Sequence, residues 1–202
     1  MRGDLKTYQA KRRFDGTPEP KGSKIARKAG APLRYLIQRH AATRLHYDFR
    51  IEHDGVLKSW AVTKAPSRDP SVKRLAVEVE DHPLDYGSFE GTIPSGNYGA
   101  GTVQLWDTGT WEPQHPDTLE ADFARGSVKM TLDGERLKGG WALVRLKSDR
   151  GKPSKRNNWL LIKEKDDFAV PGEGDALAEI DASVTTGRTL AEIAAGDAEW
   201  TK

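Results

Sequence analysis

Residues 38 to 64 read Gln-Arg-His-Ala-Ala-Thr-Arg-Leu-His-Tyr-Asp-Phe-Arg-Ile-Glu-His-Asp-Gly-Val-Leu-Lys-Ser-Trp-Ala-Val-Thr-Lys. From Leu45 to Glu52, apolar and polar side chains alternate, which is the period of a β-strand with one apolar and one polar face. Asp54-Gly55 then predicts a tight hairpin turn into a second strand, Val56–Val62. His46, Asp48 and Arg50 should therefore point to the same side of the first strand.

This polar face predicts a metal and phosphate site. Next-but-one side chains on a strand lie about 7 Å apart, so an imidazole and a carboxylate can share one ion while a guanidinium reaches a bound anion. His46 and Asp48 are thus candidate metal ligands, Arg50 is a candidate phosphate clamp, and His40 lies just upstream. The alternative is a solvated strand face without a site.

Further strands are predicted at short spacing along the chain. Turn signals separate them at Asp107-Thr108-Gly109, Asp133-Gly134 and Lys147–Asn158, and many short strands with such turns predict an all-β barrel or sandwich. The strands expected besides the first two are Leu33–Gln38, Leu75–Glu80, Gly101–Trp106, Thr110–Glu112, Val128–Leu132, Trp141–Leu146 and Trp159–Lys163. The five tryptophans on the predicted strands, including Trp60 in Val56–Val62, should pack in the core, although one of them stacking on a nucleobase is an alternative.

Charge divides the 202-residue chain unevenly. Residues 1–50 carry 13 Lys and Arg against 4 Asp and Glu, a net of +9, and the rest has a net of −7. This asymmetry favours a polyanionic partner, because Lys and Arg neutralise phosphates. We expect a basic N-terminal arm at 1–32, flexible or folded over the site, a β domain at 33–168 and an acidic tail or linker at 169–202.

Short helices and the absence of some features complete this outline. Helices are expected at Thr118–Arg125 and after the capping-box pattern at Thr189 to Glu192. The chain has no cysteine, so any metal must be held by histidine and carboxylate. No apolar run approaches the roughly 20 residues of a membrane span. We therefore expect a soluble, monomeric, cytoplasmic protein with no membrane partner.

A second polar cluster follows the strand expected at Leu75–Glu80, where a loop can present His82 and Tyr86. Two hypotheses then compete. His46, Asp48 and His82 could form the two-histidine, one-carboxylate triad of an Fe(II) oxygenase, but no arginine for a keto-acid cosubstrate occurs between His82 and Arg125. Phosphoester chemistry on nucleic acid is the other hypothesis, and it is supported by Arg50, Lys64, Arg74 and the basic first quarter of the chain.

Seven stretches of the chain match motifs of a known family: Gln38–Arg50, Leu57–Ala61, Leu75–Tyr86, Phe89–Gly91, Tyr98–Thr102, Gly139–Val144 and Trp159–Lys163. Through them the chain resembles the 3′-phosphoesterase module of bacterial DNA ligase D over roughly residues 8 to 195. The resemblance implies a compact, closed or nearly closed β-barrel with a polar interior, and a role in end healing during bacterial or archaeal non-homologous end joining. That family removes a 3′-terminal ribonucleoside and then the 3′-phosphate with a divalent metal, preferably Mn²⁺.

The resemblance also implies residue roles. His40, His46 and Asp48 would hold the metal, and Arg50 and His82 would contact the scissile phosphate with Tyr86 assisting. Lys64, Arg74 and Glu80 match supporting catalytic positions, and Arg12 and Glu19 in the arm match substrate-binding ones. Arg13 stands where the family commonly has Asp.

The implied partners are DNA or DNA-RNA 3′ ends, with ligase and polymerase modules in cis or in trans at the nucleoid. The ligase reaction itself is not expected, because no Lys-x-Asp-Gly motif occurs in the chain. A non-catalytic module that only binds DNA ends for a ligase remains an alternative.

Overall fold

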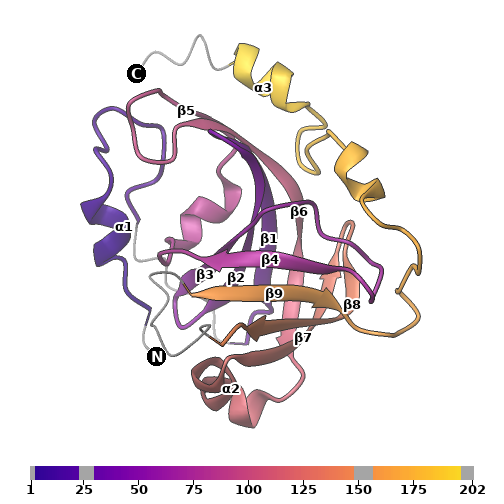
Figure 1. Ribbon diagram of the computed structural model, residues 1–202. Helices are drawn as coiled ribbons and strands as arrows, with labels where there is room; N and C mark the ends of the chain where they lie inside the picture. The colour runs from indigo at the N-terminus through magenta and orange to yellow at the C-terminus, as the bar shows by residue number, and fades with distance from the viewer. Residues whose placement is uncertain (1–2, 23–29, 148–156, 197–202) are drawn as a thin grey trace.

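Eight antiparallel strands close into a barrel in the computed structural model, which describes residues 3–22, 30–147 and 157–196 (Figure 1). Pairing of β1 with both β2 and β6 closes the ring, and the three-residue β5 (Gly91–Ile93) is added beside the first part of β6. The predicted all-β barrel is therefore confirmed. In barrel order the strands are β1 (Leu33–Ala41), β2 (Leu45–His53), β3 (Val56–Val62), β4 (Lys73–Glu78), β9 (Asn158–Lys163), β8 (Lys138–Arg145), β7 (Ser127–Gly134) and β6 (Gly101–Pro113).

The interior of the barrel is apolar, which corrects the polar interior implied by the resemblance. Tyr47, Phe49 and Ile51 of β2 belong to a buried cluster that draws on all eight strands. Alternation along β2 then sends His46, Asp48 and Arg50 to the opposite face, outside the barrel. The five strand tryptophans lie in the interior and are at most 2% exposed, so none can stack on a base: Trp60, Trp106, Trp111, Trp141 and Trp159.

The outer face of β1, β2 and β3 is covered in turn. The 3₁₀ helix η1 (Leu84–Ser88), β5 and the N-terminal arm pack against it through a second apolar cluster that contains Tyr8, Leu36 and Leu57. The arm, which was expected to be flexible or folded over the site, carries one helical turn, α1 (Lys6–Ala10). Both faces of β2 are therefore buried. The alternative of a solvated strand face is wrong, because Arg50 on that face is 2% exposed.

The single strand β6 replaces the two strands that were expected at Gly101–Trp106 and Thr110–Glu112. β6 runs through Asp107, Thr108 and Gly109, where a turn was expected. The Asp107 carboxylate accepts hydrogen bonds from the Tyr35 hydroxyl and from distant backbone amides instead of closing a local turn. Gly109 allows a close approach between strands, because a Cβ there would lie 2.1 Å from the Asp133 carbonyl oxygen.

The remaining short helices follow the expected pattern closely. α2 (Leu119–Arg125) follows η2 (Pro116–Thr118) and ends at Gly126 with a φ of 79°. α3 (Leu190–Gly196) begins with the expected capping box, since the Glu192 carboxylate accepts from the Thr189 amide and the Glu192 amide donates to the Thr189 hydroxyl. Most of the turn expected at Lys147–Asn158 lies outside the described residues.

The acidic segment after residue 168 lies along the barrel. Glu173 pairs with Arg68, the Leu177 side chain of η4 (Ala176–Glu179) joins the barrel core, and the Ile180 carbonyl accepts from the Trp106 indole. The division of the chain at residues 32 and 168 stays a prediction. Within the described ranges, no helix is long and apolar enough to cross a membrane.

Candidate active site

Three candidate metal ligands meet where β1 and β2 pair. His40 and His46 are directly opposite each other across the two strands, and Asp48 is the next residue on the same face of β2. His40 Nδ1 lies 3.5 Å from Asp48 Oδ2, and His46 Nε2 lies 3.5 Å from Asp48 Oδ1. Within the described ranges these side chains form the one cluster of three possible ligands, with all ligand atoms within 4.8 Å of one another.

Hydrogen bonding around His46 shows that this cluster suits a cation. The Nδ1 atom of His46 lies 2.9 Å from the Arg44 carbonyl oxygen, which only accepts, so Nδ1 carries the proton in the neutral ring. Two lone pairs, on Nε2 and on Asp48 Oδ1, then face each other. Ligand bonds of roughly 2.1 Å place neighbouring ligand atoms roughly 3.0–3.5 Å apart, so a divalent ion between the two fits the spacing.

Arg50 is held beside the cluster by three hydrogen bonds. Its Nη2 donates to Asp48 Oδ2 at 3.0 Å, its Nε to the Gln38 side-chain oxygen at 2.8 Å and its Nη1 to the Ser59 hydroxyl at 2.8 Å. Burial alone would raise the pKa of Asp48, but the charge of Arg50, with His40 and His46, holds that pKa below the usual aspartate value. Asp48 is therefore ionised, as a metal ligand would have to be.

His82 enters the site from the loop after β4. Its backbone forms a two-way bridge with Leu57 at the start of β3, with N–O distances of 2.8 and 3.0 Å. The Nδ1 atom donates to the Glu80 carbonyl at 2.9 Å, so Nε2 is the acceptor and lies 3.2 Å from Arg12 Nη2. Burial, together with the charges of Arg50 and Arg12, holds the pKa of His82 well below the histidine value, and the ring is neutral.

Both His82 nitrogens thus have hydrogen-bond partners, which counts against His82 as a metal ligand in the oxygenase hypothesis. His82 does not belong to the cluster of possible ligands, which contains His40 instead.

The Tyr86 ring packs edge-on against His82 with centroids 4.8 Å apart, and the Arg50 guanidinium lies 5.0 Å from the Tyr86 centroid. Burial raises the pKa of the Tyr86 phenol well above 10, so this hydroxyl keeps its proton.

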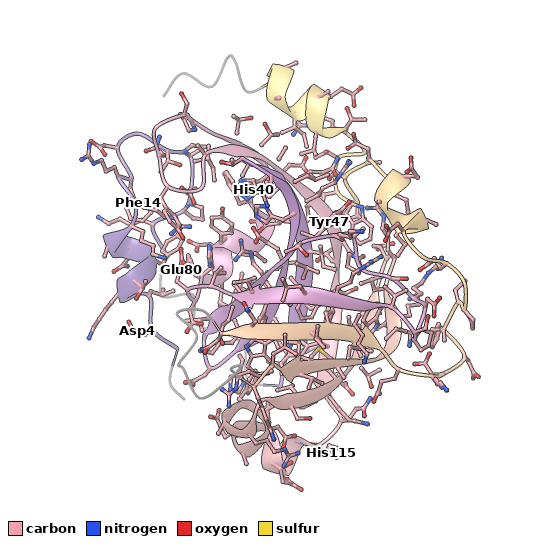
Figure 2. All side chains as sticks on the ribbon, viewed as in Figure 1. Asp4, Phe14, His40, Tyr47, Glu80 and His115 are labelled. Carbon is pink, nitrogen blue, oxygen red and sulfur yellow. The ribbon has the colours of Figure 1, made fainter. Side chains whose placement is uncertain are left out.

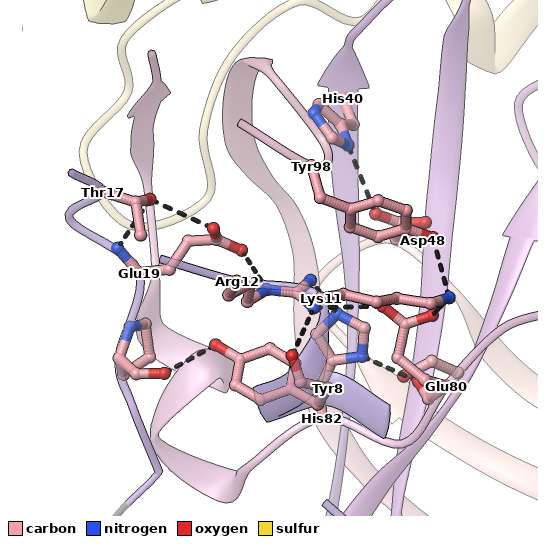
Figure 3. A network of polar contacts seen from close by, with 12 residues as sticks. Tyr8, Lys11, Arg12, Thr17, Glu19, His40, Asp48, Glu80, His82 and Tyr98 are labelled. Carbon is pink, nitrogen blue, oxygen red and sulfur yellow. Dashed lines mark hydrogen bonds and ion pairs between the residues drawn. The ribbon is translucent and has the colours of Figure 1, made fainter. Parts of the chain in front are cut away.

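The N-terminal arm supplies two cations to the site (Figure 3). Arg12 donates to Glu19 Oε1 at 2.8 Å and to Glu80 Oε1 at 3.1 Å, and its guanidinium lies 3.9 Å from the Tyr8 ring centroid. Lys11 donates to Glu80 Oε2 at 2.9 Å. Burial opposes ionisation of Glu80, but bonds from Lys11 and Arg12 hold its pKa below the glutamate value.

Arg13, which stands where the family commonly has Asp, lies outside this network. Arg13 is exposed, and so is Asp15, the nearest acidic residue after it. The arm carboxylate that reaches Arg12 is instead Glu19, which is 4% exposed. The described part of the arm is therefore folded over the site and contributes one buried carboxylate to it.

A cleft of about 190 Å³ opens between these groups. Figure 2 shows His40 and Glu80 in the same region of the molecule, with His115 at the opposite end. Eight of the eleven predicted site residues line the cleft, and Glu19 lies behind Arg12. The eight are Arg12, His40, His46, Asp48, Arg50, Glu80, His82 and Tyr86.

Lys64 and Arg74 are not brought to the cleft. Both pair with Asp175 of the C-terminal segment, and Arg74 also donates to the carbonyl oxygens of Ala65 and Gly174. The Lys64 side chain is 65% exposed. In this structure the two residues tie the C-terminal segment to the ends of β3 and β4, and a catalytic role for them stays a prediction.

Sequence reasoning missed residues that hold or border the site. Gln38 and Ser59 orient Arg50, and their positions follow from register, because Ser59 is the cross-strand partner of Arg50 on β3 and Gln38 that of Asp48 on β1. Lys11 and Tyr98 come from loops that periodicity does not place. Only a correct pairing of β1, β2 and β3 could have identified the first two.

Comparisons with known proteins identify a family and relatives for this chain. The family model for the DNA ligase D 3′-phosphoesterase domain matches residues 38–145. The multifunctional non-homologous end joining protein LigD of Pseudomonas aeruginosa is 51% identical over 187 residues, covering 92% of this chain and 22% of that protein. The protein of the same name from Mycolicibacterium smegmatis is 43% identical over 166 residues, covering 80% and 21%. The chain spans about a fifth of the length of these relatives.

Proposed function

Because the chain belongs to the DNA ligase D 3′-phosphoesterase domain family, we propose that it is a metal-dependent hydrolase that heals 3′ ends of DNA or DNA-RNA strands. It removes a terminal ribonucleoside, a 3′-phosphate or both, and leaves a 3′-hydroxyl. The observation that carries the proposal is one cleft that joins the His40, His46 and Asp48 cluster to two guanidinium groups, those of Arg50 and Arg12.

The proposed reaction is hydrolysis at phosphorus. Water forms a new bond to the phosphorus, the bond to the 5′-oxygen of the terminal ribonucleoside breaks, and that oxygen leaves as a hydroxyl with a proton. A second hydrolysis frees inorganic phosphate and leaves the 3′-hydroxyl. A divalent ion bound by His40, His46 and Asp48 would supply charge neutralisation at a phosphate oxygen and a lowered pKa for bound water.

The chain's own residues then have distinct tasks. Arg50 is fixed by Gln38, Ser59 and Asp48, so it can stabilise charge on the phosphoryl group without reorganising. In the free protein, neutral His82 lacks a proton at Nε2 and can therefore accept one. Donation to the leaving oxygen requires that Nε2 first be protonated, which an anionic substrate beside it favours.

Mn²⁺ is the ion we propose, on the family resemblance. Two imidazoles and one carboxylate also suit zinc, cobalt or iron ions, so the donor set itself does not select manganese. The matched relatives carry names that describe multifunctional end-joining proteins. We propose that the domain acts beside polymerase and ligase modules, in cis or in trans, on DNA ends in the bacterial cytoplasm.

A primer-template assay tests this function. A strand ending in a 3′-phosphate, or in one 3′ ribonucleotide, should be converted to a 3′-hydroxyl with Mn²⁺ and should remain unchanged with a chelator. Absence of any metal-dependent conversion would refute the proposal, and tight binding of the 3′-phosphate without turnover would support a non-catalytic end-binding module. Consumption of a keto acid with ferrous iron would instead support the oxygenase.

Metal binding can be tested without turnover. His46→Ala should lose Mn²⁺ binding measured by titration calorimetry, because it removes a central ligand of the cluster. His115→Ala is the matched control, since His115 is exposed and lies at the opposite end of the molecule (Figure 2). Full Mn²⁺ affinity in His46→Ala would show that the ligand assignment is wrong.

A further inference from the structure

Tyr98 exposes an aromatic ring at the border of the cleft. It lies between β5 and β6, and its side chain is 47% exposed, whereas the other four tyrosines of the chain are at most 2% exposed. Lys11 fixes its position, because the Lys11 ammonium donates to the Tyr98 hydroxyl at 3.1 Å and lies 4.7 Å from the ring centroid. The Arg12 guanidinium lies 5.4 Å from the same centroid (Figure 3). The ring is thus oriented by the arm and still accessible.

A second hollow, of about 640 Å³, adjoins the cleft at this ring. The two spaces share Val79, Glu80 and Tyr98, so they adjoin along these residues, and a ligand that extends from one into the other passes beside the Lys11 ammonium. Two ammonium groups and four carboxylates line the second hollow, a formal net charge of −2. These groups belong to Lys11, Lys58, Asp4, Glu78, Glu80 and Asp81.

This charge discriminates between the two sides of a scissile phosphodiester, the retained strand and the terminal ribonucleoside. The retained strand carries a phosphate at every nucleotide, and the net negative charge of the hollow disfavours its entry. The terminal ribonucleoside carries no phosphate beyond the scissile one, so no such repulsion acts on it. Its ribose hydroxyls can donate hydrogen bonds, and carboxylates accept them. The second hollow therefore suits the leaving side of the substrate and is unsuited to the strand.

We propose that this hollow receives the departing terminal ribonucleoside and that its base stacks on Tyr98. The inference rests on the proposed function, since it places the scissile phosphate at the metal-ligand cluster and Arg50. Base stacking on an aromatic ring is tolerant of sequence because every base has a π-face. Such a contact would accept any terminal base, as an end-healing enzyme requires.

Tyr98→Ala and Tyr98→Phe test the proposal on two substrates. A 3′ ribonucleotide end contains the departing nucleoside, and a 3′-phosphate end does not. In Tyr98→Ala the ratio of kcat/KM for ribonucleoside removal to that for phosphate removal should fall by roughly 5- to 150-fold, the range that loss of one base stack gives. Tyr98→Phe keeps the ring and should hold the ratio within about 2-fold. Phe168→Ala removes another exposed ring, 49% exposed, and should leave both rates unchanged.

Two outcomes would overturn the proposal. Equal losses on both substrates would show that Tyr98 contacts the retained strand or supports the fold, and no loss on either would show that it contacts no nucleoside.

Adenosine 5′-monophosphate gives a readout without turnover, because its phosphate mimics the scissile group. With Mn²⁺ it should bind more tightly than inorganic phosphate, and Tyr98→Ala should remove most of that advantage. If the wild-type protein converts neither substrate, the proposed function fails, and this binding comparison still decides the role of Tyr98.

Discussion

Gln38→Met is the substitution that most directly tests how the site is organised. The Gln38 side chain is fully buried, accepts from Arg50 Nε and donates to the carbonyl oxygens of Tyr86 at 3.2 Å and Phe89 at 2.8 Å. Methionine has a similar shape but leaves all three groups without this partner. A buried polar group left unpaired costs about 1–3 kcal/mol, so we expect a loss of roughly 3 kcal/mol or more in the free energy of unfolding. For a chain of this size that lowers the Tm by roughly 6–12 °C.

The same change should slow catalysis because Arg50 loses one of its three anchors. We expect kcat for 3′-phosphate removal to fall roughly 10- to 100-fold, the range for a misplaced catalytic group, with the Mn²⁺ affinity unchanged. Gln38→Glu separates the two effects: it keeps an acceptor for Arg50 but loses both donors to the carbonyls. It should be destabilised at least as much as Gln38→Met yet retain a higher kcat. A Gln38→Met protein with wild-type kcat would refute the positioning role.

Three further predictions follow from buried groups. The pKa of His82 is held well below its ordinary 6.5 in the folded state, so below about pH 6.5 the unfolded state binds the extra proton and stability falls. Urea unfolding at pH 7 and pH 5 should show this slope, and His82→Gln should flatten it; an unchanged slope would contradict the assignment. Arg12→Met leaves the buried carboxylate of Glu19 without its guanidinium, so it should cost roughly 3 kcal/mol and speed proteolysis of the arm, whereas exposed Lys6→Met should do neither. Leu177→Ala should cost about 2–5 kcal/mol in chemical unfolding if the C-terminal segment completes the barrel core, while Val170→Ala, 37% exposed, should cost little.

Alternation along β2 predicted which side chains share one face of the strand but not what surrounds them. The period-2 pattern placed His46, Asp48 and Arg50 on one face, and the structure agrees. His40 required more, because its meeting with His46 depends on the short connection between Ala41 and Leu45 that sets the register of β1 against β2. A one-residue shift in that register would have turned His40 into the barrel interior.

Contacts across long stretches of sequence explain most of what the sequence did not reveal. Arg12 meets Glu80 across 68 residues and His82 across 70, and no local pattern specifies such pairings. The continuous β6 was missed for a similar reason, since Asp107 and Gly109 have the composition of a turn but are used for distant hydrogen bonds and for a close approach to Asp133. Local propensity gave way to tertiary contacts at both places.

Asp48 links the candidate metal ligands to Arg50, the proposed phosphate-binding residue, through a single carboxylate. Its Oδ2 accepts from Arg50 at 3.0 Å and lies 3.5 Å from His40, while Oδ1 faces His46. The carboxylate is buried, and an isolated buried charge is costly, so the Arg50 guanidinium stabilises it as a paired charge. A metal ion bound at the histidines would share this carboxylate with Arg50. Because one group orients the arginine and belongs to the candidate ligand set, loss of the Asp48 carboxylate would remove one of the three anchors of Arg50 and one candidate metal ligand together.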